Sequence, residues 1–197
     1  MINKYKKNRY LVIGLGNPGK QFSGNRHNVG KMIITGLSKE SEAPLVAKHP
    51  KAELAEVVFN DNEAIIATIS DHMNSSGFGV SALVNHFDID LNRLIVVHDD
   101  LDLDLGQIRI KKGGGTGGHN GLRSIVDILG SEEFLRVRLG IGRPSGKKDP
   151  AEFVLSDFNV VQFSELEFVL GVAIDVIKAI VTDGVDEAMN RYNIKKR

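Results

Sequence analysis

The 197-residue chain contains no cysteine. This absence excludes a disulfide framework, a thiolate nucleophile and any zinc or iron–sulfur site that depends on cysteine, and it fits a reducing compartment. No run of eighteen apolar residues occurs, so we expect no transmembrane helix and no membrane partner. A cytoplasmic protein is the simplest expectation, and an organellar one is the alternative.

Acidic and basic residues balance to a formal net charge of zero, which excludes a protein that binds polyanions over its whole surface. The distribution is uneven, however. Residues 105–148 contain nine basic and three acidic side chains, a local net charge of +6. Such an excess can steer a phosphate-bearing ligand to one face. An ordinary solvated surface with uneven charge explains the count equally well.

Residues 1–8 are polar and basic and lack the apolar stretch of a secretory signal. We expect them to form a flexible leader. The rest of the chain contains no internal repeat, low-complexity tract or linker, so we expect a single domain over residues 1–197.

Apolar periodicity predicts an alternation of strands and helices until the last quarter of the chain. Strands are expected at 9–15, 54–59, 64–69, 94–97, 107–111 and 135–141, and helices at 28–37, 74–86, 120–129, 164–181 and 185–192. Residues 60–62 are typical of a hairpin, Asn74 of a helix cap and Gly130 of a helix end. The pattern predicts an α/β sandwich with a mixed sheet and a helical C-terminal layer.

The segment Gly14–Gly19 fits the dinucleotide fingerprint GxGxxG after a strand. That motif needs a helix that starts within the glycines, and residues 20–25 are a poor helix. With Lys20 the segment also approaches a phosphate-binding loop, but Gln21 stands where a magnesium-binding hydroxyl is required. A phosphate-loop nucleoside triphosphatase therefore stays only as the best alternative enzyme.

The alternating acids Asp100, Asp102 and Asp104 imitate a calcium-binding loop. The glycine follows one place late at Gly106, and Lys111 stands where a bidentate glutamate is needed. We therefore expect no metal at this segment.

Polar residues follow strands or precede helices in five turns. They are Asn17, His27, Met73-Asn74, His98-Asp99 and His119-Asn120. In an α/β sheet such turns gather along one edge, where ligands bind. A histidine can take a proton from water, a carboxylate can orient it, and amides can bind a carbonyl oxygen that gains charge. Because G-x-S-x-G does not occur, water is expected to be the attacking group.

Six strings carry a resemblance to a known family. VIGLGNPG, NRHNVG, MNSSG, VVHDDLDL, KGGGTGGHNGLRS and RVRLGIGRP resemble the signatures of bacterial-type peptidyl-tRNA hydrolases, in that family's order and spacing. The likeness runs from Tyr10 to Pro144 and continues more loosely through the final helices. Any one string is weak evidence, but six in register are very specific.

The resemblance implies a single-domain α/β/α sandwich around a mixed twisted sheet, and hydrolysis of the ester between a peptide and tRNA without metal or organic cofactor. Separately, we expect a monomer. The resemblance places the catalytic pair at His27 and Asp99. It places the groups that line the peptide and ester site at Asn17, Phe22, Met73, Asn74 and Asn120. More loosely, it places the groups that hold the tRNA acceptor end and its 5′-phosphate at Arg109, Lys111 and Arg138.

Several residues depart from the family pattern. Phe22 stands where a tyrosine is common, Asp71-His72 and Ser75 alter the surroundings of Asn74, and Asp100 replaces a glutamate. These changes affect the expected shape of the peptide channel. A non-catalytic RNA-binding module on the same fold is the rival interpretation, and the complete set of histidine, aspartate and three asparagines argues against it.

Overall fold

One seven-stranded sheet forms the centre of the protein in the computed structural model, which describes residues 9–144, 146 and 149–193. The expected leader, 1–8, lies outside the described residues. The strands are β1 (Tyr10–Gly14), β2 (Val46–His49), β3 (Ala52–Phe59), β4 (Asn62–Ile69), β5 (Leu94–Asp100), β6 (Ile108–Lys112) and β7 (Leu135–Gly140). Their order in the sheet is β2-β3-β4-β1-β5-β7-β6.

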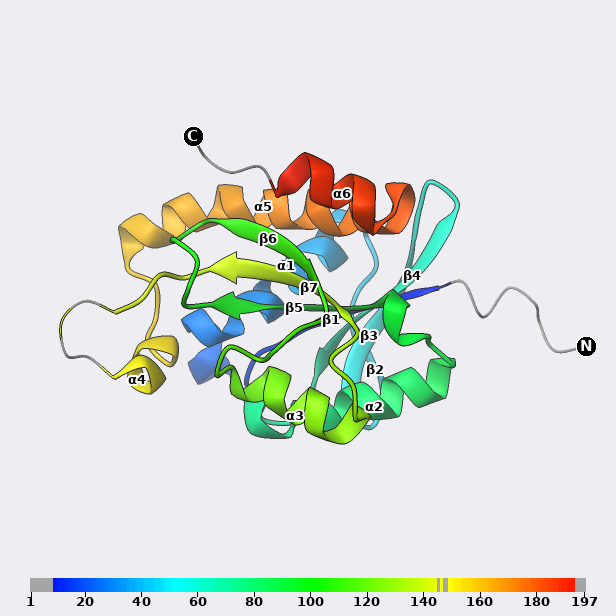
Figure 1. Ribbon diagram of the computed structural model, residues 1–197, viewed down its shortest axis with the longest axis horizontal. Coiled ribbons are helices and arrows are strands. Elements are labelled where there is room, and N and C mark those ends of the chain that lie inside the picture. Colours follow the sequence, from blue (N-terminus) through cyan, green and yellow to red (C-terminus); the bar gives the residue numbers. More distant parts are fainter. Residues whose placement is uncertain (1–8, 145, 147–148, 194–197) are drawn as a thin grey trace, which may run out of the picture.

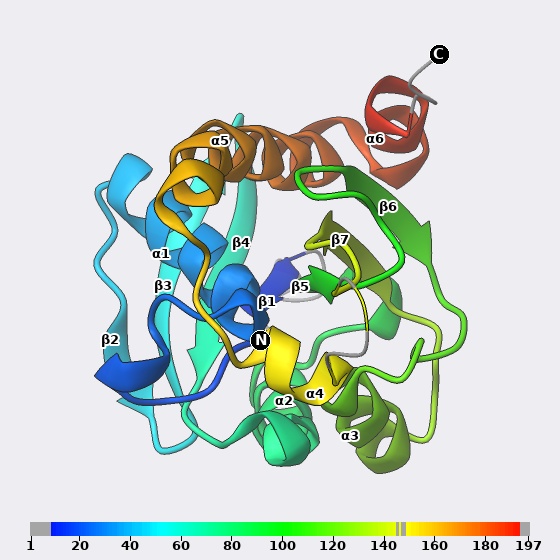
Figure 2. The same ribbon diagram turned by 90° about the vertical axis from the view of Figure 1, so that its left-hand side faces the viewer.

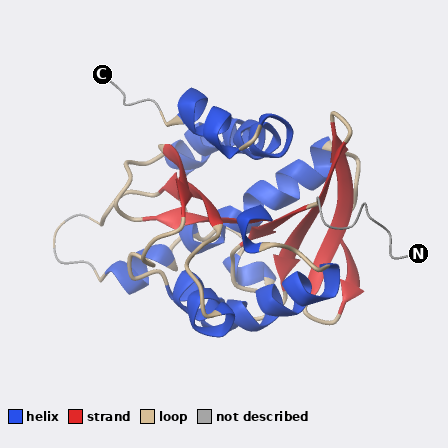
Figure 3. Cartoon of the chain, turned by 45° about the vertical axis from the view of Figure 1, so that its right-hand side comes forward, coloured by secondary structure: helices blue, strands red, loops and turns tan. Residues whose placement is uncertain are grey.

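The sheet is mixed, as the sequence predicts. β1 runs parallel to β4 and β5, and β5 runs parallel to β7. β3 is antiparallel to β2 and β4, and β6 is antiparallel to β7. The carboxyl ends of β1, β4, β5 and β7 therefore lie at one edge of the sheet. Figure 3 shows the twist of the strands, and in Figure 1 the arrows of β5 and β7 point toward this edge.

The described residues also form six α-helices and four short 3-10 turns, and the last three helices follow the last strand. The helices are α1 (Val29–Glu40), α2 (Ser76–Phe87), α3 (Asn120–Leu129), α4 (Pro150–Val154), α5 (Val160–Asp183) and α6 (Val185–Tyr192). The turns are η2 (Lys20–Phe22), η3 (Arg26–Asn28), η4 (Met73–Ser75) and η5 (Leu91–Arg93). No helix in these described ranges has both the length and the apolar character needed to cross a bilayer.

Two apolar layers sandwich the sheet. α1, α5 and α6 cover one face, and α2 and α3 cover the other (Figures 1 and 2). The alternation of side chains along a strand explains the division, since Val12 of β1 packs toward the first layer while Leu11 and Ile13 pack toward the second. The expected single-domain α/β/α sandwich with a helical C-terminal layer is confirmed.

The first glycines of the GLGNPG segment are needed for packing. A Cβ at Gly14 would collide with the backbone of Gly30 and the side chain of Ile34 in α1, and a Cβ at Gly30 would collide with the carbonyl of Val97. The helix therefore lies directly on the sheet. It begins only at Val29, so it does not start within the glycines as the dinucleotide motif requires.

Some local predictions are confirmed. Helix α3 has the expected bounds and ends at Gly130 in the left-handed conformation (φ 67°). The hairpin between β3 and β4 turns at Asn60 and Asp61, both with positive φ.

Other local predictions are wrong. β2 and α4 were not expected, and α5 starts at Val160, four residues early, because an Asn159 capping box fixes its first turn. Helix α2 begins at Ser76 and no side chain caps it, since Asn74 lies inside the preceding turn η4.

Strand β5 continues through Asp100, so His98 and Asp99 lie within it and pair with β7. Strand β7 lies inside the sheet between β5 and β6, and its Arg136 is only 2% exposed.

Candidate active site

A buried carboxylate joins two histidines at the carboxyl edge of the sheet. The Oδ1 atom of Asp99 lies 2.8 Å from Nδ1 of His27 and 3.1 Å from Nε2 of His119. Asp99 comes from β5, His27 from η3, and His119 directly precedes α3. Asp99 and His27 are buried, and the side chain of His119 is 8% exposed. Three segments far apart in the sequence thus meet at one oxygen atom.

The hydrogen bonds define the protonation of this cluster. Burial by itself raises the pKa of Asp99, but the charges and hydrogen bonds of His119 and His27 outweigh burial and hold that pKa well below its usual value. The carboxylate is therefore ionised and can only accept, so both histidine nitrogens that face it must donate.

His119 also has a structural function in the helix that follows. Its Nδ1 atom accepts the backbone N–H groups of Gly121 (3.1 Å) and Leu122 (3.3 Å), so His119 caps α3. An accepting Nδ1 fixes the Nε2–H tautomer. His27 has the opposite tautomer, with Nδ1–H bound to Asp99, which leaves its Nε2 as a lone-pair acceptor.

The residue before His27 anchors its turn to the start of α5. The guanidinium of Arg26 is buried and donates to the carbonyls of Ser156 (3.0 Å) and Asp157 (2.5 Å), and to the side chain of Gln162 (2.8 Å). The ring centroids of Phe153 and Phe158 lie 4.4 and 5.0 Å from the guanidinium carbon. The backbone that carries His27 is therefore rigidly held.

Amide hydrogen bonds link three of the polar turns. Asn17 accepts the backbone N–H of Met73 through Oδ1 at 2.9 Å, and its own N–H donates to Oδ1 of Asn28 at 2.8 Å. Asn28 in turn donates from Nδ2 to the Asn17 carbonyl at 2.9 Å. Within the described ranges no hydrogen bond uses Nδ2 of Asn17, so this donor is available to a ligand.

The remaining expected peptide-site residues differ in their exposure and in the elements that carry them. Asn120 is the exposed first residue of α3, and the sulfur of Met73 lies against its neighbour Gly121. Asn74 is exposed in η4, which contacts α3. Phe22 is half-buried in η2, and among the described residues no ring contact or hydrogen bond joins its side chain to the cluster.

A cavity of about 570 Å³ opens beside the histidine cluster. His27, Asp99, His119 and Asn120 line one part of it, together with the glycine-rich segment 115–118. Lys111, Arg136, Arg138 and Arg143 also line the cavity, as do Pro150, Ala151 and Val154 of α4. The cavity therefore joins the candidate catalytic groups to a group of cations.

The cations differ in how far their charge is neutralised. Arg138 donates to Asp100 at 2.7 Å, and Arg143 forms an ion pair with Asp102 at 2.5 Å. Within the described part of the chain Lys111 has no acidic partner. Lys111 therefore has the larger unneutralised charge for an anionic ligand.

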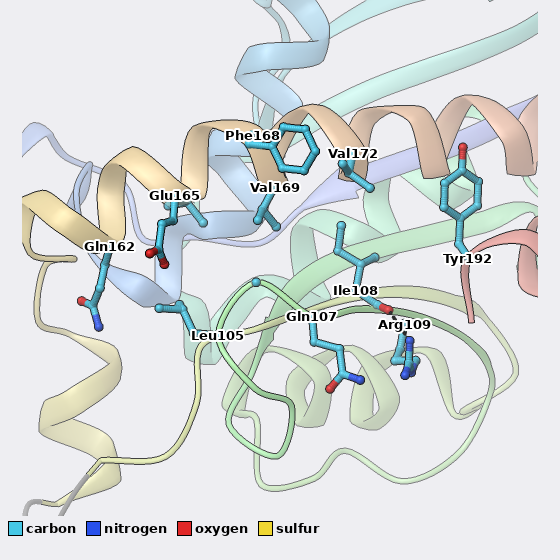
Figure 4. A pocket seen from close by; sticks show the side chains of 12 residues that line it. Leu105, Gln107, Ile108, Arg109, Gln162, Glu165, Phe168, Val169, Val172 and Tyr192 are labelled. Carbon is cyan, nitrogen blue, oxygen red and sulfur yellow. Dashed lines mark hydrogen bonds between the residues drawn. The ribbon is translucent and has the colours of Figure 1, made fainter. Parts of the chain in front are cut away.

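Arg109 is not among the residues that line this cavity. It lines the rim of a second cavity, of about 580 Å³, between β6 and α5 (Figure 4). Ile108 points into this cavity toward Val169 and Val172, whereas Gln107 and Arg109 point away from it. Since Arg109 pairs with Arg138 across β6 and β7, its side chain lies on the same sheet face as Arg138 and Lys111.

His27, Asp99 and His119 are also the group of described residues that can hold a metal ion, since their ligand atoms lie within 4.8 Å of one another. The Nδ1 lone pair of His119 is already used by the α3 backbone, and both other nitrogen contacts have hydrogen-bond lengths. Hydrogen bonding alone therefore accounts for the arrangement.

The buried imidazole of His98, next to Asp99, makes the stability of the folded protein depend on pH. Burial, with the nearby His119, lowers the pKa of His98 to about 3. Between pH 6.5 and pH 3 the unfolded chain therefore binds a proton that the folded protein does not, and stability falls with acidification. In urea unfolding, His98→Gln is expected to reduce the loss of stability between pH 7 and pH 4.5 by about 2–3 kcal/mol.

The control for this experiment is His72→Gln, which removes an exposed histidine and should keep the full acid sensitivity. An unchanged pH dependence in the His98 variant would show that this imidazole is not kept neutral by burial.

Sequence reasoning missed two contributors to the site. His119 was named only together with Asn120, and Asn28 was not singled out. Their adjacency to expected site residues was the available signal. The hydrogen bonds that involve them join positions 11 and 20 residues apart, which no local pattern reveals.

An imidazole with one nitrogen bound to a buried carboxylate and the other unpaired is typical of hydrolytic enzymes of the histidine–carboxylate type. The comparisons with known proteins define the family. A family model described as peptidyl-tRNA hydrolase matches residues 11–197, so the chain belongs to the peptidyl-tRNA hydrolases, which act on the ester bond of peptidyl-tRNA.

Individual relatives are similar to this chain over nearly its full length. The peptidyl-tRNA hydrolase of Frankia alni is 46% identical over 184 residues, 93% of each chain. That of Frankia casuarinae is 44% identical over 193 residues, 98% of each chain. The crystal structure of the Acinetobacter baumannii enzyme has a TM-score of 0.88 and 32% identity, and the match covers 96% of this chain and 97% of that one.

Proposed function

We propose that this enzyme hydrolyses peptidyl-tRNA by direct attack of water, with His27 as the general base and Asp99 as the group that orients it. The observation that supports this proposal most strongly is the 2.8 Å contact between Nδ1 of His27 and Asp99, which leaves Nε2 as a base beside the cavity. Recycling of tRNA from aborted translation is the biological purpose that we infer.

In the first step, water bound at Nε2 of His27 gives up a proton and attacks the carbonyl carbon of the ester. The imidazolium that forms is stabilised by the ionised Asp99. As the tetrahedral intermediate collapses, the bond to the ribose oxygen breaks, and His27 returns its proton to that oxygen. The products are a free peptide carboxylate and a tRNA with its terminal hydroxyl restored.

We assign the amides to the peptide and to the developing oxyanion. Asn120 lines the same cavity as His27 and is the candidate for the carbonyl oxygen that gains charge. Asn17, with its free Nδ2, and Asn74 would bind the peptide, with Met73 and Phe22 as apolar neighbours. A need for a peptide amide beside the ester would spare ordinary aminoacyl-tRNA.

We further propose that Arg109, Lys111 and Arg138 bind the acceptor end of the tRNA and its 5′-phosphate without reading sequence. All three side chains lie on one sheet face, which supports a common ligand. A monomer with one catalytic domain, working in the cytoplasm, completes the proposal.

The direct test is turnover of a peptidyl-tRNA by the purified enzyme, with uncharged tRNA and free peptide as the expected products. Binding of tRNA without any hydrolysis would instead support the non-catalytic RNA-binding module and reject the proposed mechanism.

Lys111 has no acidic partner in the described part of the chain, so its removal should weaken electrostatic binding. Lys111→Ala is expected to raise the Kd for tRNA and to lower the slope of log Kd against log salt by about 1. The control is Lys112→Ala, since Lys112 is exposed and pairs with Asp186 at 2.5 Å. Equal salt slopes in wild type and in both variants would reject a phosphate contact at Lys111.

A further inference from the structure

The glycine-rich segment contains glycines that packing does not require. A Cβ added at Gly121 would collide with the sulfur of Met73, so that position has no room for a side chain. At Gly115, Gly117 and Gly118 no atom lies within 4 Å of an added Cβ. Gly117 and Gly118 have positive φ, which glycine accommodates, but Gly115 does not. Neither packing nor conformation therefore explains the glycine at 115.

A buried cation binds the backbone of this segment on the side that faces the protein interior. Arg136, 2% exposed, donates from its guanidinium to the carbonyls of Gly114 and Gly115, the latter at 2.7 Å, and stacks on Phe134 at 4.8 Å. These bonds tie the backbone to β7 on its protein side. Gly115 is nevertheless exposed, and residues 115–118 line the cavity that contains His27 and Asp99. The segment is thus a fixed strip of almost bare backbone, with Thr116 as its only side chain.

The two ends of this strip have different chemistry. At one end, His119 binds Asp99, the partner of His27, so this end adjoins the proposed site of ester attack. At the other end, Nζ of Lys111 lies against Gly114 and has no acidic partner in the described part of the chain. In peptidyl-tRNA the ester and the nearest phosphate are separated by one ribose. The order of groups along the strip therefore matches the order of groups in the substrate.

We propose that the strip formed by residues 115–118 binds the terminal ribose of the tRNA by direct contact with its backbone. This inference depends on the proposed function. The absence of a side chain at Gly115 lets the sugar approach the backbone closely, so that the ester reaches His27 while the adjacent phosphate reaches Lys111. Arg136 positions the strip and does not touch the substrate.

The test is Gly115→Ala. The structure has space for the added methyl group, and replacing a glycine outside the left-handed region reduces the entropy of the unfolded chain, so Tm should stay the same or rise. If the sugar lies on the strip, the methyl displaces it, and KM for peptidyl-tRNA should rise by about tenfold or more. The matched control is Gly171→Ala in α5, which is also exposed and unobstructed and should keep the wild-type KM.

Two further ligands identify which part of the substrate is displaced. A peptidyl ester of adenosine keeps the terminal nucleoside and lacks phosphate, and Gly115→Ala should raise its KM as well. Uncharged tRNA keeps the ribose and lacks the peptide, and its Kd should also rise in the variant.

An unchanged KM for peptidyl-tRNA in a folded Gly115→Ala variant would overturn the proposal. If Gly115→Ala leaves the KM of the adenosine ester unchanged, the strip binds phosphate. If it leaves the Kd of uncharged tRNA unchanged, the strip binds the peptide. Either result rejects the ribose. Failure of the wild-type enzyme to hydrolyse peptidyl-tRNA would reject the proposed function itself, which separates the two outcomes.

Discussion

His27→Ala is expected to lower kcat for peptidyl-tRNA by about 10²- to 10⁴-fold, the usual contribution of a positioned general base. The variant removes the only nitrogen in the cluster that has a free lone pair, since Nδ1 of His119 is bound by the α3 backbone. Binding of uncharged tRNA should be nearly unchanged, because the cations of the cavity remain. Single-turnover hydrolysis and tRNA binding should be measured on the same preparation.

The control for this variant is His86→Ala, which removes an exposed histidine from α2. It should leave kcat at the wild-type value. Turnover of the His27 variant within threefold of wild type would assign the base to another residue, and parallel losses of tRNA binding and turnover would indicate damage to the cavity.

Asp99→Asn is expected to lower kcat by a similar factor, about 10²- to 10⁴-fold. The substitution keeps the size of the side chain and removes its charge. An amide is a weaker acceptor for the N–H groups of His27 and His119, and it gives no counter-charge to the imidazolium that forms during attack. The loss should therefore appear in kcat more than in KM.

The double variant His27→Ala, Asp99→Asn provides a sharper test of the pair. Because Asp99 acts through His27, the double variant should be no slower than His27→Ala alone. Multiplicative losses would show that the carboxylate contributes to catalysis by a separate route, and the assignment of Asp99 as the orienting group would fail.

The sequence predicted elements that bury an apolar face, and missed those that do not. β2 contains no buried residue and α4 buries none either, so neither has a regular pattern of apolar positions. Arginines alternate with apolar residues along β7, a pattern typical of a strand with one exposed face. Arg136 is buried instead because two loop carbonyls from the glycine-rich segment bind its guanidinium, a contact between residues more than twenty positions apart.

The candidate site was predictable where chemistry and strand ends coincide. His27 and Asp99 have residue types suited to hydrolysis, and parallel strands bring their segments to one edge. The difference between Arg138 and Lys111 was not predictable. It depends on whether an acid lies within reach in space, and the partner of Arg138 is Asp100, 38 positions away in the sequence.

The central claim is that Asp99 holds His27 in the Nδ1–H tautomer and so leaves Nε2 free to activate water. Long-range ¹H–¹⁵N NMR of the uniformly labelled enzyme at neutral pH, with His27 assigned by its absence in the His27→Ala spectrum, reports the tautomer directly. The account predicts a protonated Nδ1 and an unprotonated Nε2 for His27, and the opposite tautomer for His119. A neutral His27 with its proton on Nε2 would contradict the account, because that nitrogen has no lone pair to take a proton from water.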